Sequence, residues 1–182
     1  LLIAHCRCRL GHPPARPRAD RRLILADAAS LVPARSRRQN ARMTTHAARL
    51  QVSTRGDTHV LDVTDQVAAV LAESGIRSGI LVVFVVGSTA AITTTEAEPG
   101  LMNHDLKAFW ERIAPQHERY RHEETWNDDN GHAHVRAAAL GPSLSVPVID
   151  GRMTLGTWQQ IVLLDFDTRP RRREVVVQIV GQ

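Results

Sequence analysis

The stretch HEETWNDDNGHAH, residues 122–134, is the part of the chain richest in side chains that bind metals or transfer protons. It holds three histidines, two glutamates and two aspartates. Imidazoles and carboxylates together form catalytic divalent-metal sites, in which one coordination position stays open for water or substrate. Polar loops that precede a helix have a similar composition, and the stretch has neither a thiolate nor H-x₃₋₅-H spacing. It therefore predicts a candidate site without fixing the chemistry.

The relation between His132 and His134 depends on the local structure. The alanine-rich segment 130–140 is typical of a short helix that Asn130 caps and Gly141 ends. Residues two apart on a helix are rotated by about 200°, so the two rings diverge there, whereas on a strand they would share one side. We therefore predict that His134 belongs to the site and that His132 does not.

His134 then shares its helix face with Ala137 and Ala138, small residues that permit close packing. It needs partners from outside the helix. The candidates are His122, Asp128 and Asp129. Two imidazoles and one carboxylate make a divalent site for Zn²⁺ or a similar ion. The residues alone do not decide which of the two aspartates supplies the carboxylate.

The elements that must position these residues are mostly strands. Apolar patterns predict strands over 48–55, 58–64, 79–87, 88–96, 143–150, 154–167 and 173–181, and helices over 63–75, 101–114 and 130–140. This order predicts the α+β class, with a mixed, mainly antiparallel, β-sandwich-like core and two to three short helices. Segment 79–87 is continuously apolar, which predicts a strand buried on both faces. We expect Thr64 to cap the first helix and a bend or bulge at Gly87.

The positive charge of the chain is concentrated at its start. Residues 1–42 hold ten arginines and two aspartates, so residues 43–182 keep 13 of the 23 basic residues and 17 of the 19 acidic ones. Segment 1–42 shows no sustained periodicity, and the first methionine is Met43. We expect 1–42 to be either a disordered basic extension or an artefact of upstream translation, and 43–182 to be a single domain. A transit peptide fits the arginines but not the scarcity of serine.

Several classes of function are disfavoured by composition. A nucleic-acid partner would rest on the arginine tail alone, so we expect none. Both cysteines, Cys6 and Cys8, lie in that tail, which excludes disulfides and thiolate metal sites from residue 43 onward and suits a cytoplasmic protein. No apolar run reaches membrane-spanning length, so we expect no membrane partner. The absence of a Walker motif, G-x-G-x-x-G and G-x-S-x-G argues against nucleotide binding and serine hydrolysis.

Further polar residues stand near the predicted strands. Ser88 and Thr89 form a turn whose N–H groups and hydroxyls can hold an anion. Glu96 is either a catalytic carboxylate or an ordinary one at a strand edge. Asp105 borders the apolar stripe of its helix, so it is paired, hydrogen-bonded or metal-bound, or else reaches solvent.

The segment GRMTLGTWQQ, residues 151–160, adds three candidates. Trp158 and Gln159 need hydrogen-bond partners if they are buried on a strand, so they are not both plain core residues. Arg152 either binds a phosphate or flanks the turn at the surface.

Seven segments, taken in order along the chain, resemble the YjbQ family of small bacterial and archaeal proteins. They are GSTAAITTTE, NHDL, YRHEE, DDNGHAH, GPSLSVPV, DGRMTLGTWQQIVLLDFD and RPRRREVVVQIVG. The resemblance covers about residues 47–181, and LGTWQ is its most characteristic part. It implies an α+β fold with a β-sandwich-like core, assembled as a homotrimer, with a polar site near subunit boundaries. It also implies a secondary thiamine-phosphate synthase, which joins a pyrimidine pyrophosphate to a thiazole phosphate.

The resemblance carries over residue by residue. The positions that match the family motifs are Glu96, Asp105, His122, Asp129, His134, Trp158 and Gln159, with Ser88 and Thr89 in the loop. This chain departs from the family at Gly87, where many members have histidine. His132 is not a general family feature, which agrees with its predicted place outside the site.

Two classes of function remain open. In an enzyme, we expect a divalent metal such as Zn²⁺ or Mg²⁺, with His122, Asp129 and His134 as its ligands, to bind the pyrophosphate leaving group. Glu96 or Asp105 then acts on the thiazole partner, while the phosphate is held by Arg136 or Arg152. A hydrolase that uses the same metal to activate water is the enzymatic alternative. In the other class, a non-catalytic trimer holds a metal or small anion, and a closed coordination shell would favour that class.

Overall fold

The computed structural model describes residues 42–182, and the structural statements below concern that part of the chain. Apart from Arg42, the basic extension predicted for 1–42 lies outside the described residues. No helix within 42–182 is long and apolar enough to cross a membrane.

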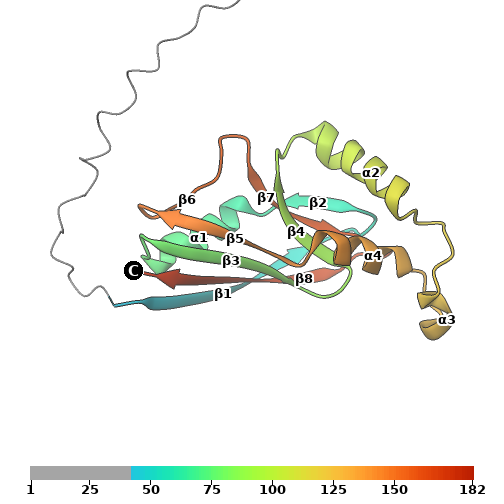
Figure 1. The fold of residues 1–182 in the computed structure, drawn as a ribbon, viewed down its shortest axis with the longest axis horizontal. Coiled ribbons are helices and arrows are strands. Elements are labelled where there is room, and N and C mark those ends of the chain that lie inside the picture. Colours follow the sequence, from blue (N-terminus) through green and yellow to red (C-terminus); the bar gives the residue numbers. More distant parts are fainter. Residues whose placement is uncertain (1–41) are drawn as a thin grey trace, which may run out of the picture. The chain divides into compact units, whose positions relative to one another are not determined.

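The described chain forms two antiparallel sheets (Figure 1). The larger sheet has the order β1-β8-β3-β5-β6, with β1 Thr44–Ser53, β8 Arg172–Gly181, β3 Gly79–Val86, β5 Ser143–Ile149 and β6 Arg152–Met153. The smaller sheet has the order β2-β7-β4, with β2 His59–Asp62, β7 Gln160–Asp165 and β4 Ala90–Thr95. The predicted α+β class with antiparallel strands is confirmed.

Four α-helices and a π-helical turn accompany the sheets. They are α1 Thr64–Ser74, the π-turn η1 Leu101–Asp105, α2 Leu106–Ile113, α3 His122–Trp126 and α4 Gly131–Leu140. Helix α4 begins after Asn130 and ends at Gly141, as predicted. Helix α3 was not predicted. Helix α1 has Val63 rather than Thr64 as its N-cap, because the Thr64 hydroxyl instead accepts a hydrogen bond from the main-chain N–H of Ile161 at 2.8 Å.

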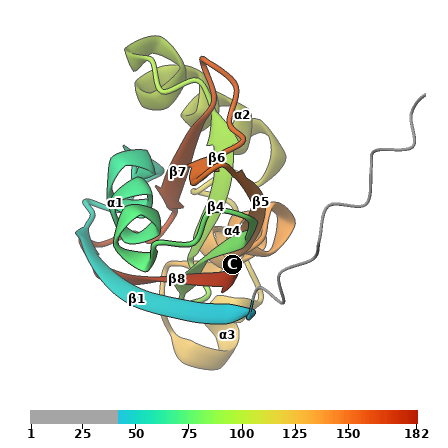
Figure 2. The same ribbon diagram turned by 90° about the vertical axis from the view of Figure 1, so that its left-hand side faces the viewer.

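The main core lies between the two sheets. The inward side chains of the larger sheet pack with α1 and with one face of the smaller sheet, and Figure 2 shows α1 between β1 and β7. A second core lies on the other face of the smaller sheet, where α2 and α4 cover it through Trp110, Ala133 and Ala137. Consequently β7 is the strand buried on both faces: Leu163 faces the main core and its neighbours Val162 and Leu164 the second.

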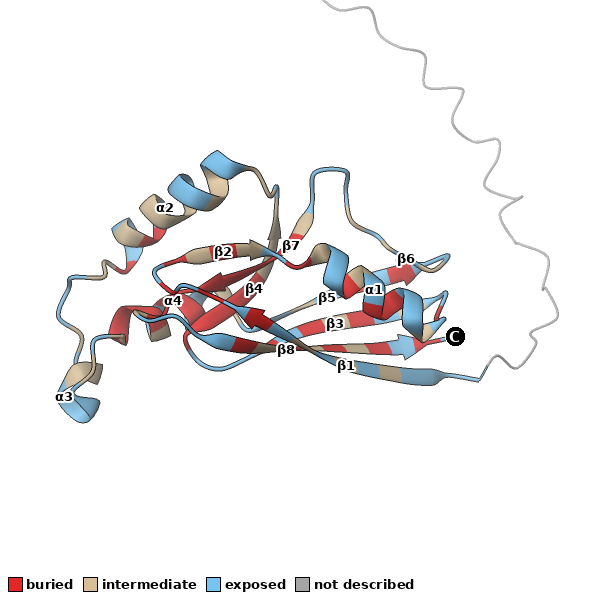
Figure 3. Cartoon of the chain, turned by 180° about the vertical axis from the view of Figure 1, so that it is seen from behind, coloured by how far each residue is buried: buried red, intermediate tan, exposed pale blue. Residues whose placement is uncertain are grey.

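The continuous apolar run of β3 has a different surrounding from the one predicted. Leu81, Val83 and Val85 are buried, but the alternate residues Ile80 and Phe84 are exposed, at 55% and 41% (Figure 3). The prediction that both faces of this strand are buried is therefore wrong for the single chain, whose larger sheet has one open face. At the end of β3 the chain bends at Gly87, with φ of +130°, and crosses into the smaller sheet. This confirms the predicted bend.

Candidate functional site

An open cleft of about 330 Å³ lies between the β3–β4 turn and one face of α4. Gly87 and Ser88 line it from the turn, and His134, Ala137 and Ala138 line it from the helix. The helical spacing predicted that these three α4 residues share a face, and the structure confirms it. Because the two alanines have short side chains, the turn and the helix leave room between them.

A second histidine stands beside this cleft. The ring centroids of His122, at the start of α3, and His134 lie 4.5 Å apart at 54°. Burial and the neighbouring His122 lower the pKa of His134, against the opposing influence of Asp128 and Asp167. His134 is therefore mainly neutral near pH 7, and an imidazole in that state can accept or relay a proton. The predicted pairing of His122 with His134 is present.

The carboxylate nearest this pair is Asp128, whose Oδ1 lies 3.4 Å from Nε2 of His122. Asp129 turns elsewhere and accepts a hydrogen bond of 2.8 Å from the hydroxyl of Thr168. Asn127, with φ of +52°, ends α3 in the left-handed conformation, so the next residues leave in a new direction. The expected ligand set of His122, Asp129 and His134 is thus not brought together.

The fit of a metal ion can be tested on these distances. Two ligands about 2.0–2.2 Å from a tetrahedral ion lie roughly 3.3 Å apart, which suits His122 and Asp128. Within residues 42–182, however, no three histidine, cysteine or carboxylate side chains converge as a metal site requires. The described residues therefore fit a metal only in part.

His132 diverges from His134 as predicted, and it points into the second core. It is 1% exposed, and neither ring nitrogen has a hydrogen-bond partner. The ring lies 6.2 Å from that of Tyr120 between centroids, and the main chain of Phe166 is close to it without reaching hydrogen-bonding geometry. Burial and nearby Arg136 lower the pKa of His132. His132 is a buried neutral residue outside the cleft.

Arg136 is fully buried and acts within the fold. Its guanidinium donates to the carbonyl of Ala114 at 2.9 and 2.7 Å, to the hydroxyl of Thr58 at 2.9 Å and to the carboxylate of Glu111 at 2.7 Å. These contacts join α4 to the end of α2 and to the β1–β2 connection. The expectation that Arg136 binds a substrate phosphate is corrected, because the side chain is fully buried and each of its three guanidinium nitrogens already donates to the protein.

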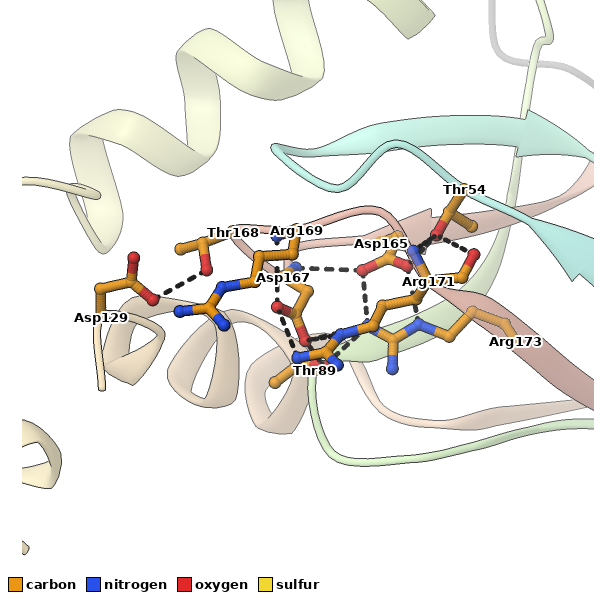
Figure 4. A network of polar contacts seen from close by, with 9 residues as sticks. All are labelled: Thr54, Thr89, Asp129, Asp165, Asp167, Thr168, Arg169, Arg171 and Arg173. Carbon is orange, nitrogen blue, oxygen red and sulfur yellow. Dashed lines mark hydrogen bonds and ion pairs between the residues drawn. The ribbon is translucent and has the colours of Figure 1, made fainter. Parts of the chain in front are cut away.

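A network of charged groups lies behind the β3–β4 turn (Figure 4). Arg173 donates to Asp165 from Nε at 2.7 Å and from Nη2 at 2.6 Å, and Nη2 also donates to the hydroxyl of Thr89 at 2.7 Å. That hydroxyl donates to Asp167 at 2.9 Å, while Arg171 donates to Asp167 at 3.0 Å. Burial favours a raised pKa for Asp167, but hydrogen bonds from Arg171 and Thr89 outweigh it and lower the pKa.

This network was missed by the sequence analysis. Its signal is D-F-D at the end of one strand and R-R-R at the start of the next, across the turn TRP. Alternate residues of a strand share a face, so Asp165 and Asp167 can meet Arg171 and Arg173 across that turn. Of the two turn residues predicted to hold an anion, Thr89 belongs to this network and Ser88 is exposed at the cleft.

Four predicted site residues lie away from the cleft. Glu96 follows β4, whereas Ser88 precedes it, and six residues of strand separate the two by roughly 20 Å. Arg152 is exposed and pairs in register with the far end of β5, opposite the end that follows α4 (Figure 1). Gln159 donates to the hydroxyl of Thr94 at 2.9 Å, in the loop before β7. That loop also carries Trp158, which is 71% exposed, so the expectation of a Trp on a strand is wrong.

Asp105 reaches solvent at the end of η1. Its carboxylate lies 2.9 Å from Nδ1 of His104, and both side chains are largely exposed. Of the alternatives weighed for Asp105, a solvent-exposed carboxylate is the one observed.

Fold and cleft together define a small α+β protein in which a helix bearing a histidine covers the smaller of two antiparallel sheets. Residues 48–182 match the family model described as UPF0047 protein YjbQ-like. The chain is 39% identical over 140 residues to a UPF0047 protein of Methanothermobacter thermautotrophicus, covering 77% of this chain and 95% of that protein. It is 37% identical over 133 residues to UPF0047 protein YugU of Bacillus subtilis, covering 72% and 97%.

The fold is also similar to a solved structure. A crystal structure of a YbjQ-like protein of unknown function from Sulfolobus solfataricus P2 superposes with a TM-score of 0.73 at 36% identity, over 78% of this chain and all of that one. The chain therefore belongs to the UPF0047 YjbQ-like family.

Proposed function

We propose that the protein is a transferase of the secondary thiamine-phosphate synthase type, and that its reaction takes place at the cleft beside His134. The observation that carries this proposal is the histidine pair: His134 lines the cleft opposite the Ser88 turn, and the ring centroid of His122 lies 4.5 Å from that of His134. Such a pair can place positive charge and a proton beside a phosphate group.

The reaction breaks one bond and forms one bond. The lone pair of the thiazole nitrogen attacks the methylene carbon of the pyrimidine, and the bond from that carbon to the pyrophosphate oxygen breaks with its electron pair. Pyrophosphate leaves, and no oxidant is needed. Charge develops on the leaving oxygen, so a donor placed there lowers the barrier. His134 and His122 are positioned to supply that donor, and the hydroxyl of Ser88 is a further donor at the cleft.

The proposed reaction has no role for Glu96, Asp105 or Arg152 of the same chain, because these residues lie outside the cleft. Exposed Trp158 and Gln159 likewise belong to the loop beyond β6. The proposal therefore rests on fewer residues than the family resemblance suggests.

The test is pyrophosphate release by the full chain from a pyrimidine pyrophosphate and a thiazole phosphate. We expect His134→Ala and His122→Ala each to lower the rate by 10²-fold or more, a typical cost of losing a general acid or base. His104→Ala is the matched control, because that histidine is exposed and outside the cleft. No release by the wild-type chain, or equal loss in His104→Ala, would remove the proposal.

Metal binding is a separate proposal. If a divalent ion binds at the cleft, His122 and Asp128 are the side chains spaced to hold it, with His134 adjacent. Such an ion would neutralise charge on a leaving pyrophosphate or activate water for hydrolysis. Metal content of the purified chain, measured by mass spectrometry, decides the matter: stoichiometric metal should be lost in Asp128→Asn and retained in Asp129→Asn. Wild-type protein without metal rules the ion out.

We propose, from the family resemblance, that the chain assembles as a homotrimer. The support is the open face of the larger sheet, where Ile80, Phe84 and Val86 alternate along β3 and Val180 of β8 pairs in register with Ile80. Exposed apolar patches of this kind mark interaction surfaces. Light scattering should give a mass of three chains for the wild type and one for Phe84→Glu. Ile113→Glu, an equally apolar exposed position on α2, is the control.

A further inference from the structure

Arg173 has donors that its own network does not use. A guanidinium carries five N–H groups: one on Nε and two on each terminal nitrogen. Nε donates to Asp165, and Nη2 donates to Asp165, Thr89 and, at 3.4 Å, to Asp167. Within residues 42–182 no hydrogen bond is made by Nη1. The two N–H groups of Nη1 are therefore free to bind another acceptor.

The unused nitrogen remains in contact with solvent. Among the described residues, the only fully buried side-chain nitrogens or oxygens without a partner belong to His132. Nη1 of Arg173 is therefore not sealed in the core, although the residue as a whole is 8% exposed. A buried guanidinium with one accessible end costs little to orient for a ligand, because Asp165 already fixes its plane.

Gly87 connects this nitrogen to the cleft. A Cβ at Gly87 would lie 3.2 Å from Nη1 of Arg173, and no other heavy atom beyond its chain neighbours would lie within 4 Å. Gly87 also lines the cleft that contains His134. The space left by the missing side chain thus lies between the cleft and the free end of the arginine. The main chain of Ser88 and the charge of Asp167 both act to raise the pKa of His134. The network that contains Asp167 therefore lies close to the cleft.

The charges around Arg173 permit an additional anion. Asp165 and Asp167 are balanced by Arg173 and Arg171, so the buried cluster is neutral as a whole. Asp128 is the remaining carboxylate close to the histidine pair, and it faces His122. An oxyanion in the cleft would accept hydrogen bonds from Nη1 of Arg173, from the Ser88 hydroxyl and from the ring N–H of His134. Three donors from separate elements suit a tetrahedral phosphate, which offers three free oxygens.

We propose that Arg173 is a ligand-binding residue, whose Nη1 donates through the gap at Gly87 to the phosphate of a small molecule held in the cleft. This inference rests on the proposed function, since it assigns the phosphate position within the same cleft. Arg173 takes the phosphate-binding role that the sequence analysis gave to Arg136 or Arg152.

Two variants test the two halves of the proposal. Arg173→Lys keeps a positive charge but removes the terminal nitrogen that points toward Gly87. Gly87→Ala leaves Arg173 in place and fills the gap, although its φ of +130° also strains an alanine. The matched controls are Arg49→Lys, at an exposed arginine paired with Glu174, and Gly151→Ala, at a glycine with φ of +76° whose Cβ would lie 3.7 Å from an Arg77 nitrogen.

Binding of inorganic phosphate to the full chain is measured by calorimetry, with acetate as the comparison anion. Loss of a charged hydrogen bond should weaken phosphate binding about tenfold in Arg173→Lys and in Gly87→Ala, and leave both controls unchanged. Absence of phosphate binding in the wild type, equal weakening in the controls, or acetate bound as tightly as phosphate would overturn the proposal. If Arg173→Lys does not fold, Gly87→Ala decides: unchanged affinity there overturns it.

The outcomes also separate this inference from the proposed reaction. Phosphate binding that depends on Arg173, in a protein that releases no pyrophosphate, supports the binding site and removes the synthase proposal. Pyrophosphate release with phosphate affinity unchanged in Gly87→Ala supports the synthase and overturns the role of Arg173.

Discussion

The rings of His122 and His134 lie with centroids 4.5 Å apart, although one begins α3 and the other lies in the first turns of α4. The contact that holds them is a close approach at Gly131, the first residue of α4. A Cβ there would lie 2.8 Å from Cγ of Tyr120 and 3.5 Å from Cβ of His122. The absence of a side chain at one position thus brings the loop and the helix together.

Replacing His132 should stabilise the protein and change how its stability depends on pH. The pKa of His132 is lowered below its ordinary value of 6.5, so the unfolded chain binds a proton more readily than the folded one. The free energy of unfolding is therefore highest above pH 6.5 and decreases as the pH falls toward the folded pKa. His132→Leu removes two unpaired nitrogens and should add about 1 kcal/mol at pH 7.5.

The measurement is urea unfolding of wild type and His132→Leu between pH 5 and 8. The difference between the two proteins should widen as the pH decreases. The exposed Val135 of α4 supplies the control, since Val135→Leu changes no ionisable group and should leave the slope as in the wild type. A pH dependence identical in wild type and His132→Leu would show that protonation of this ring does not oppose folding.

Arg136→Met should cost about 3–5 kcal/mol of the free energy of unfolding, because it leaves the carboxylate of Glu111 and the carbonyl of Ala114 without their donor. Arg136→Lys should recover little of this stability, because one ammonium group cannot donate to three residues as the guanidinium does. Urea unfolding measures both. Arg112→Met, which loses one exposed hydrogen bond within α2, should cost less than 1 kcal/mol. Similar losses at the two positions would contradict the role of Arg136 as a joint between α2 and α4.

Thr89→Val should cost about 2 kcal/mol, because it keeps the shape of the side chain and removes a hydroxyl that donates to Asp167 and accepts from Arg173. Thr89→Ser keeps the hydroxyl and should lose less than half as much. Thermal unfolding followed by circular dichroism compares the two, and Thr93→Val, on the strand β4 that follows the turn, is the reference. A serine variant no more stable than the valine variant would mean that the methyl group, not the hydroxyl, is what matters.

The sequence predicted the elements better than the contacts between them. Helical periodicity placed His134 with Ala137 and Ala138 because the rotation per residue is a local property. It could not choose between Asp128 and Asp129, since that depends on the left-handed Asn127 that ends an unpredicted helix. Burial of Arg136 was equally hidden, because the acceptors that make it tolerable come from α2 and from the β1–β2 connection.

The prediction that β3 is buried on both faces was wrong for a related reason. A continuous apolar run predicts burial on both faces only if something covers each face. β7 is covered on both sides by the chain itself, whereas the outer face of β3 has no cover within residues 42–182. The same limit applies to Trp158, whose type predicts burial but whose loop projects beyond β6 and β7 (Figure 1).

Gly131→Ala should separate the two site histidines without touching either one. The added methyl group would collide with the base of the Tyr120 side chain, whose Cβ and Cγ cannot move without the loop, so the segment that carries His122 must withdraw from α4. Both causes that lower the pKa of His134, burial and the nearness of His122, then weaken, and the pKa should rise toward its ordinary value of 6.5. Histidine titration by NMR measures this shift. Gly156→Ala, whose Cβ would meet only Gln159 at 3.7 Å and beyond, should leave the titration unchanged. An unaltered pKa of His134 in Gly131→Ala would mean that the pair does not depend on this close approach.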